Sequence, residues 1–304
     1  MAAPASILPT SNDTSGRVSL EGEKSQRRRP RAPALFSNMR GEIDKHHADI
    51  PVCLCSLVSG LCDSVAFNAS SVFVSMQTGN TVFLALGTAG LPSSVRLLWL
   101  RALCSIAAFI AGVFLFSQAT RRARPTAKGT LAASFLAQAL LIWAAAGLAQ
   151  GGAAPSFASL GAAEALARSG EWDPRGLAVV VLLALGFGGQ IVASRQLGFN
   201  EVPTNVLTSL YCDLFSDPAL LAPWGRNPKR NRRAAAALLM LAGAVAGGWL
   251  SRSRDGAGLP VALWVGGAVK LGIAVAWAAW KVKDDDHAAV QQKQQQQSVV
   301  GEKK

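Results

Sequence analysis

Two polar stretches interrupt apolar sequence and carry the residue types best suited to bind a ligand. The first combines Asp63 with the neighbouring residues Thr78, Gly79 and Asn80. An ionised carboxylate at bilayer depth costs about 2.5–3.5 kcal/mol on insertion scales, so Asp63 needs a partner, a proton or water. Helix-breaking backbone at Thr78-Gly79-Asn80 is tolerated at that depth only where protein or a wet cavity covers it. We expect these residues to line a polar site; a structural partner role and a packing kink are the alternatives.

The second stretch resembles the first and lies in the other half of the chain. Gln190 follows a Gly-rich apolar segment, and Thr204, Asn205 and Thr208 follow it closely. Broken helices that present their termini to a cavity form binding sites in transporters. We expect these four residues to contribute to the same site. For Gln190 the alternative is a cap at a helix end near the interface.

Lys270 is the third candidate, because it is the sole charge in the apolar segment 256–280. At 1.5 Å per residue it stands roughly 15 Å from either end of the segment, beyond easy reach of water. A pair with Asp63 or Asp213, or a deprotonated amine, would make this burial reasonable. The alternative is a shifted helix end that leaves Lys270 shallower.

The composition indicates a membrane protein with several crossings. Half of the 304 residues are hydrophobic and 16% are charged, against about a quarter charged in soluble domains. Several windows of 18 or more residues carry no charge, which is the length of a membrane helix. The net charge of +12 lies mostly in short loops, where it orients a chain in the bilayer. We therefore expect the lipid bilayer, and no nucleic acid, as partner.

Eight apolar segments follow one another inside a membrane domain at 50–281. The segments are 51–69, 72–90, 102–120, 129–149, 176–194, 202–214, 234–251 and 256–280. Residues 1–49 and 282–304 have the composition of disordered tails. The membrane domain divides into halves at about 50–149 and 176–281, joined by a loop at 150–175.

The two halves resemble each other, which indicates an internal duplication. Arg101 and Arg121 precede Arg232 and Arg252 by one common separation, and Thr78 precedes Thr208 by one residue less. If the broken segments turn back instead of crossing, the basic loops gather better on the cytoplasmic side. We therefore predict six crossings plus two re-entrant segments, with both termini cytoplasmic in an unspecified membrane. The alternative is eight crossings.

Catalytic and metal-binding patterns are missing from the sequence. There is no nucleophile elbow, phosphate loop, zinc-protease motif or dinucleotide fingerprint. The adjacent pair His46 and His47 has no spaced partners, and the five cysteines have no zinc spacing. We expect no enzyme activity, no cofactor and no metal. The Gly243-x-x-x-Gly247 spacing leaves a homo-oligomer interface open beside packing within one chain.

Four motifs give the chain a resemblance to the YoaK family, membrane proteins of bacteria and fungi that carry a domain of unknown function. The resemblance spans about residues 50–281 and implies an integral membrane protein, without a settled activity. One position departs from the pattern, since Ser209 stands where a Gly is expected. The motifs are Gly60-x-x-Asp63, Phe73-x-Ser75-x-x-Thr78-Gly79-Asn80-Thr81, Gly186-x-x-x-Gln190 before Glu201-Val202-Pro203-Thr204, and Val206-Leu207-Thr208-Ser209.

The sequence thus predicts an all-α polytopic membrane bundle. The favoured function is a transporter or permease for a small solute or ion, with its site at mid-membrane between the two halves. No ATP-binding motif is present, so a gradient would drive it. The alternative is a non-transporting membrane scaffold or receptor that acts through its tails.

Overall fold

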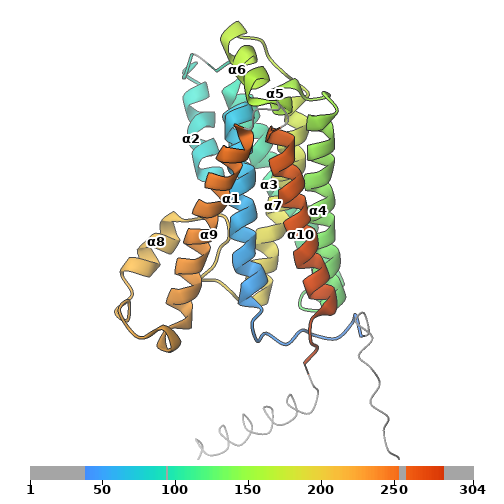
Figure 1. Ribbon diagram of the computed structural model, residues 1–304, viewed down its shortest axis with the longest axis vertical. Helices are drawn as coiled ribbons and strands as arrows, with labels where there is room; N and C mark the ends of the chain where they lie inside the picture. The colour runs from blue at the N-terminus through green and yellow to red at the C-terminus, as the bar shows by residue number, and fades with distance from the viewer. Residues whose placement is uncertain (1–37, 94, 253–257, 284–304) are drawn as a thin grey trace, which may run out of the picture. The chain divides into compact units, whose positions relative to one another are not determined.

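Six helices are long and apolar enough to cross a membrane. They come from a computed structural model that describes residues 38–283, with gaps at 94 and 253–257 (Figure 1). Each exceeds the roughly 20 residues that a spanning helix needs. This confirms the predicted all-α membrane bundle with six crossings. The helices are α1 (Asp49–Ser70), α3 (Leu98–Arg122), α4 (Lys128–Gln150), α7 (Gly176–Leu197), α9 (Pro228–Ser251) and α10 (Gly258–Ala279).

The two broken segments contain short helices. Helix α2 (Gln77–Gly87) has 11 residues and α8 (Thr208–Phe215) has 8. At 1.5 Å per residue neither can span a hydrocarbon core of about 30 Å. Helix α2 lies near the end of α1, whereas α8 lies at the opposite end of the bundle (Figure 1).

A left-handed residue ends the helix before each break. Ser71 adopts φ 58° after α1, and its N–H donates to the Phe67 carbonyl. Gly198 adopts φ 87° after α7, and its N–H donates to the Arg195 carbonyl. A left-handed residue at this position stops a helix and satisfies an end carbonyl. The first break therefore lies at 71–76, ahead of Thr78, and the prediction of a helix break at 78–80 is wrong.

The connection at 150–175, predicted as a loop, contains two short helices. These are α5 (Pro155–Ala158) and α6 (Leu160–Ser169). The Ser159 hydroxyl accepts from the Ala162 N–H at 3.1 Å and caps α6. The small residues of this connection thus fold over one end of the bundle (Figure 1).

Matching helices pack in matching ways in the two halves. Helix α1 packs along α9 as α7 packs along α3, and α4 packs on its counterpart α10. The short helices follow the same rule, with α2 on α3 and α8 on α9. Helices α1 and α7, which begin the two halves, run in opposite directions (Figure 1).

Glycines permit the close approach at both equivalent crossings. A Cβ on Gly60 would meet the Met240 carbonyl oxygen of α9, and a Cβ on Gly243 would meet the Leu57 carbonyl oxygen of α1. At the α3–α7 crossing, a Cβ on Gly188 would likewise meet a carbonyl oxygen of α3. Small residues bring helix backbones together in membranes. Gly243 therefore faces α1 of its own chain.

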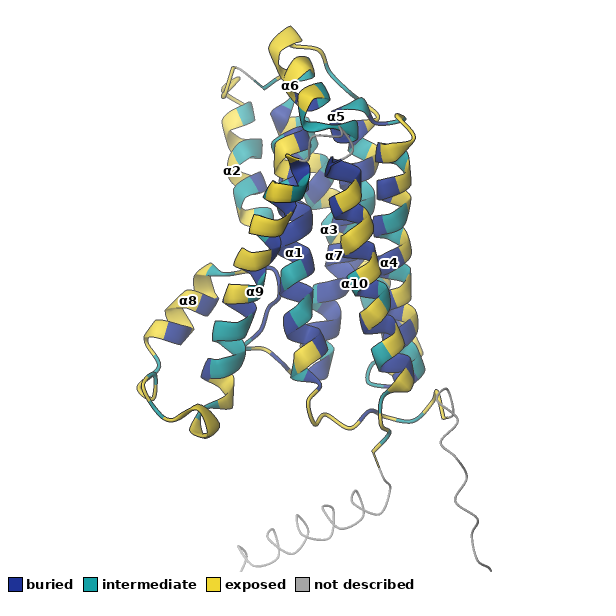
Figure 2. Cartoon of the chain, viewed as in Figure 1, coloured by how far each residue is buried: buried dark blue, intermediate teal, exposed yellow. Residues whose placement is uncertain are grey.

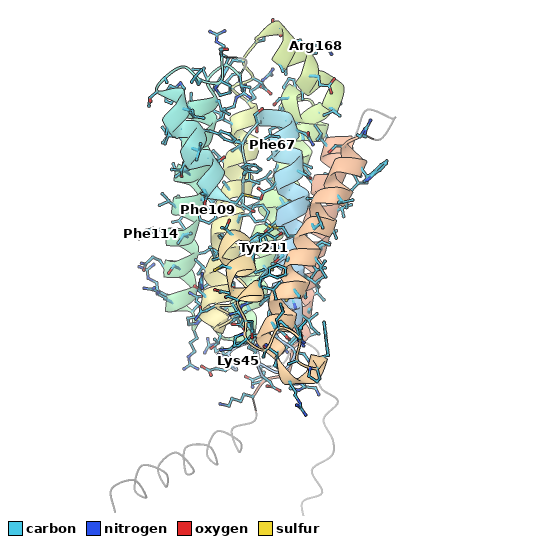
Figure 3. The ribbon with its side chains drawn as sticks, turned by 90° about the vertical axis from the view of Figure 1, so that its left-hand side faces the viewer. Lys45, Phe67, Phe109, Phe114, Arg168 and Tyr211 are labelled. Atoms are coloured by element: carbon cyan, nitrogen blue, oxygen red, sulfur yellow. The ribbon has the colours of Figure 1, made fainter. Side chains whose placement is uncertain are left out.

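The outside of the bundle is apolar. Figure 2 shows exposed residues along the helices, and many of them are large hydrophobic residues. Phe67, Phe114 and Tyr211 are among them, and Figure 3 shows their positions. Phe114 is 61% exposed. A soluble protein seldom exposes so many large apolar side chains together, whereas lipid covers them in a membrane protein.

Residues just ahead of α1 pack on the bundle, although the sequence predicts a disordered tail over 1–49. Ile43 is 3% exposed and forms a bridge with Val282, just beyond α10. The Ile43 N–H donates to the Thr126 carbonyl at 3.1 Å. Both ends of the described chain therefore lie at one end of the bundle. The tails predicted to be disordered lie largely outside the described residues.

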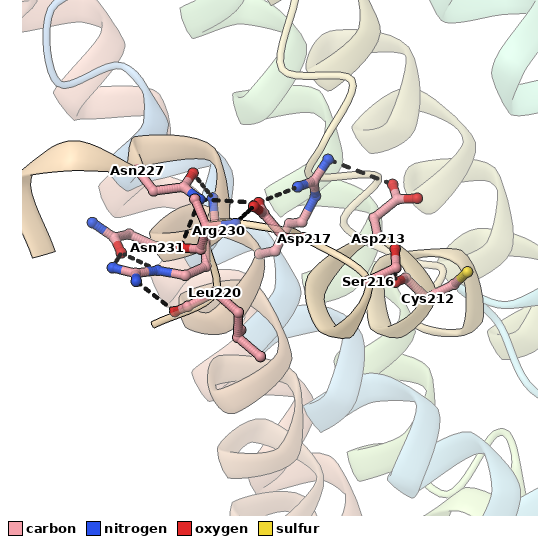
Figure 4. Close-up of polar contacts among 10 residues, drawn as sticks. Cys212, Asp213, Ser216, Asp217, Leu220, Asn227, Arg230 and Asn231 are labelled. Atoms are coloured by element: carbon pink, nitrogen blue, oxygen red, sulfur yellow. Dashed lines mark hydrogen bonds and ion pairs between the residues drawn. The ribbon is translucent and has the colours of Figure 1, made fainter. Parts of the chain in front are cut away.

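The corner between α8 and α9 is held by polar contacts (Figure 4). Asp217 accepts from the Asn227 amide at 3.0 Å and from the Ala219 N–H at 2.9 Å. The Asn227 oxygen in turn caps α9 through the Arg230 N–H at 3.0 Å, next to Pro228 at the first helical position. Helix α9 therefore begins six residues earlier than the apolar segment predicted at 234–251.

Candidate functional site

The centre of the candidate site is the amine of Lys270 on α10, which is 1% exposed. Its Nζ donates to Oε1 of Gln138 on α4 at 2.8 Å, to Oε1 of Gln190 on α7 at 2.5 Å, and to Sγ of Cys55 on α1 at 3.9 Å. These three acceptors match the three hydrogens of a protonated amine. Four helices, two from each half, thus meet at one buried nitrogen.

Two aromatic rings flank the same amine. Nζ lies 4.9 Å from the centre of the Phe135 ring and 5.9 Å from that of Phe187. A cation within about 6 Å of a ring face is attracted by the ring quadrupole. The rings and the amide oxygens are therefore the groups that would stabilise a positive charge on Nζ.

Lys270 contacts neither of the carboxylates predicted to pair with it. Within the described chain no ion pair reaches its amine, and Asp213 instead lies 3.6 Å from a guanidinium nitrogen of Arg233. Lys270 meets α1 at Cys55, two helical turns before Asp63, which is roughly 12 Å along the axis. Asp213 stands on the short helix α8, at one end of the bundle. The predicted pair is wrong for this geometric reason.

Gln190 connects the amine to the second break. Its Nε2 donates to Oδ1 of Asn205 at 2.7 Å and to Oγ of Ser59 at 2.8 Å. The Thr204 hydroxyl donates to the same Asn205 oxygen at 2.8 Å, and Asn205 is 1% exposed. The structure therefore brings together Gln190, Thr204, Asn205 and Lys270 out of the nine predicted site residues.

Asp63 supports the first break. Its Oδ1 accepts from the N–H groups of Val74 and Ser75, each at 2.8 Å, and its Oδ2 accepts from the Ser75 hydroxyl at 2.5 Å. These backbone donors have no helical partner, since they lie between α1 and α2. A carboxylate that accepts several such bonds is satisfied in a buried place.

Asn80 completes the fold of the first break. Its Oδ1 accepts from the Phe73 N–H at 3.0 Å, and its Nδ2 donates to the Phe73 carbonyl at 2.7 Å and to Ser105 at 3.1 Å. Gly79 lies beside the Phe73 ring, against which a Cβ would press. Asp63, Gly79 and Asn80 thus all shape one turn of backbone.

Two predicted residues lie outside both networks. Thr78 and Thr208 stand in the first turns of α2 and α8, and both are exposed. Their positions are similar because each residue lies near the start of a short helix. Each lies on the outer side of its helix, away from the buried networks.

The sequence prediction missed Gln138, Ser59 and Cys55. Gln138 and Ser59 are 0% exposed and Cys55 is 1% exposed. One signal could have revealed two of them: Cys55, Ser59 and Asp63 follow one another at spacings of four, which places them on one face of α1. Gln138 stands in the middle of an uncharged apolar helix, the place where a polar amide needs a partner.

Two pockets lie at opposite ends of α1. A pocket of about 350 Å³ is lined by Asp49, Cys53 and Arg232 near the start of the helix. A smaller pocket of about 70 Å³ is lined by Ser70 and Ser71 at its other end. Neither pocket is lined by Lys270 or Asp63.

Comparison with known proteins places the chain in a family. Residues 52–276 match the family described as "Protein of unknown function (DUF1275)". The chain belongs to this family, and its fold is that of a helical membrane protein. No curated protein and no solved structure matches it. The expected resemblance to membrane proteins with a domain of unknown function is confirmed at this level, while the relation to YoaK stays a prediction.

Proposed function

We propose that the protein is a permease for a small solute or ion, without enzymatic activity, and that Lys270 forms the mid-membrane contact. The observation that carries the proposal is a buried amine whose partners are neutral groups from both halves. An intramembrane charge is expensive and generally marks a substrate or ion pathway. Lys270 can offer its charge to an anion or a polar oxygen, or it can exchange a proton.

The opposite directions of α1 and α7, which begin the two halves, support alternating access. In transporters with inverted repeats, the site lies at the interface between the repeats and one half rocks against the other. Here the contact between Lys270 and Gln138 spans the matching helices α10 and α4. Gln190 connects this contact to the break that precedes α8. Movement of either half would therefore change the surroundings of the amine.

The first experiment is a thermal-shift screen of the purified full chain against a panel of inorganic ions and small metabolites. We expect at least one member to raise Tm in wild type and to lose this effect in Lys270→Met. Arg168→Gln is the matched control, since it removes an exposed charge on α6 whose one ion pair is at 3.9 Å. The stabilising compound is then tested for uptake into liposomes that contain either variant.

Uptake that depends on Lys270 would support the permease. A panel without any Lys270-dependent stabilisation, or a stabilising compound that wild type does not carry across the bilayer, would contradict it. Asp63→Asn tests the first break separately, because Asp63 contacts backbone of its own half and not the amine.

The scaffold or receptor alternative is tested by removing the tails. Deletion of 1–37 and 284–304 spares Ile43 and Val282, which pack on the bundle. A permease with a cytosolic tail at each end should keep its uptake after this deletion. A scaffold should lose its cellular effect although the bundle folds.

A further inference from the structure

In the second half of the bundle, the guanidinium of Arg232 lies in the first turns of α9 and is neutralised by neighbouring side chains. Its Nε lies 2.9 Å from Oδ2 of Asp49, and its Nη1 lies 2.9 Å from Oε1 of Glu201. The guanidinium also lies over the Phe199 ring at 5.0 Å. Two carboxylates and one ring face therefore surround a single positive charge.

Arg101 occupies the equivalent position of the first half, in the first turn of α3. Its guanidinium lies over the Trp172 ring at 5.8 Å, as Arg232 lies over Phe199. Asp173, near the start of α7, acts on it electrostatically, as Asp49 at the start of α1 acts on Arg232. The two surroundings therefore agree in the ring and in having one carboxylate nearby, although only Asp49 forms an ion pair with its arginine.

The second carboxylate is missing beside Arg101. Where Arg232 meets Glu201 beyond the end of α7, Arg101 meets the end of α1, and its Nη1 donates to the Ser70 carbonyl at 3.1 Å. The next residue is Ser71, which has no charge to offer. Among the described residues no carboxylate lies within ion-pair distance of Arg101, and Asp173 is held by the N–H and hydroxyl of Ser156 at 3.0 and 2.8 Å.

A pocket opens at the place of the missing carboxylate. Ser70, Ser71 and Arg101 line it together with Asp173, whose oxygens accept from Ser156 and from the Arg175 N–H, and α6 covers it with Ala163 and Leu166. Its volume of about 70 Å³ accommodates a few water-sized groups, since one water needs roughly 10–15 Å³ by this measure. The pocket therefore suits a carboxylate on a very short chain.

We propose that this pocket binds a small carboxylate, which supplies to Arg101 the negative charge that Glu201 supplies to Arg232. A guanidinium presents planar pairs of N–H groups that match the two oxygens of a carboxylate. Arg96 and Glu171 also line the pocket; both residues are exposed and their charges offset each other. The site is separate from Lys270, so binding here does not depend on transport.

Acetate is the probe for the first test. The purified full chain in neutral lipid is titrated with sodium acetate against equal concentrations of sodium chloride. We expect acetate to raise Tm by about 2–4 °C once its concentration exceeds Kd several-fold. Arg101→Gln should abolish the shift, and Arg168→Gln, which removes a charge of the covering helix outside the pocket, should keep it.

A second variant keeps the test decisive if Arg101→Gln does not fold. Ser71→Asp places a carboxylate in the pocket at a residue with φ 58°, a conformation that Asp tolerates better than most residues. It should raise Tm in the absence of acetate and abolish the acetate response. An acetate response that persists in Ser71→Asp would overturn the proposal.

Lipid headgroups are the other source of anions near this end of the bundle. Wild type is therefore compared in nanodiscs of neutral lipid and of phosphatidylglycerol. A stabilisation that needs phosphatidylglycerol and Arg101, without any response to acetate, would overturn the small carboxylate in favour of a headgroup. The absence of both responses would also overturn it, while Lys270-dependent uptake would stay unaffected.

Discussion

Nζ of Lys270 and Oε1 of Gln138 are joined by a 2.8 Å hydrogen bond between α10 and α4. The two residues stand on helices from different halves of the chain, so the bond joins one half to the other. The buried Gln138 oxygen accepts from the amine, and the amine uses this oxygen as one of its three acceptors. This relationship makes their contributions to stability interdependent.

Loss of the amine should therefore cost more alone than together with its partner. Lys270→Met leaves the Gln138 and Gln190 oxygens without a donor, at about 1–3 kcal/mol for each unpaired group. Adding Gln138→Leu to Lys270→Met should recover part of this loss, because one stranded oxygen disappears. Thermal unfolding of the two single variants and the double variant measures the coupling, and strict additivity would contradict it.

Asp63 should act on the first break through its acceptor oxygens. Asp63→Ala leaves the N–H groups of Val74 and Ser75 unpaired, and we expect a loss of about 2–4 kcal/mol. Asp63→Asn keeps one acceptor oxygen and should lose less. Hydrogen exchange at 71–76 measures the effect: exchange should rise strongly in the Ala variant, modestly in the Asn variant, and not at all at 202–207.

Two glycines of α9 should respond in opposite directions to the same substitution. Gly243→Ala presses a methyl group against the Leu57 carbonyl of α1 and should destabilise the bundle by about 1–3 kcal/mol. Gly248 has open space around its Cβ position, so Gly248→Ala should be neutral or stabilise by up to about 1 kcal/mol. Equal losses of Tm in the two variants would show that the α1–α9 contact is not this close.

The corner between α8 and α9 should loosen in acid. Hydrogen bonds from Asn227 and Ala219, together with the charge of Arg233, lower the pKa of Asp217 below its usual range. A group with a lowered folded-state pKa stabilises the fold above its unfolded pKa, and this contribution is lost as the pH falls through the folded pKa. Limited proteolysis at 216–227 should therefore accelerate at low pH.

Asp217→Asn tests this pH dependence. The variant should be more easily cleaved at neutral pH, and its cleavage should change less between neutral and acidic pH than that of wild type. Glu164→Gln, at an exposed ion pair on α6, is the control and should leave the pH dependence unchanged. An acid response of wild type that persists in Asp217→Asn would assign the effect to another group.

The sequence was sufficient for the number of crossings and for half of the central network. Long uncharged windows predict each spanning helix, because only helices satisfy the backbone in lipid. Lys270 and Gln190 could be found because polar groups in apolar segments need partners. Their actual partners could not be found from the sequence, because Gln138 reaches Lys270 only through the packing of α4 on α10.

Local backbone was the least predictable part. The triplet at Thr78 reads as a helix break, yet α2 begins at Gln77, because Asp63 and Asn80 satisfy the preceding backbone and let the helix start there. Such contacts join residues 7 to 12 positions apart around a turn, which no local propensity describes. The short α5 and α6 were missed because small residues dominate this connection, although α6 is amphipathic at the helical period.

The bridge between Ile43 and Val282 brings the first and last described residues of the bundle within hydrogen-bonding distance, with the Lys283 N–H donating to the Glu42 carbonyl at 2.9 Å. If the chain is trimmed to its described residues, a linker of a few residues can therefore join the two ends into a ring. New ends opened in the connection at 150–175 would then give a circular permutant that starts with the second half. The protein thus offers a direct way to exchange the order of its two halves while every spanning helix keeps its neighbours.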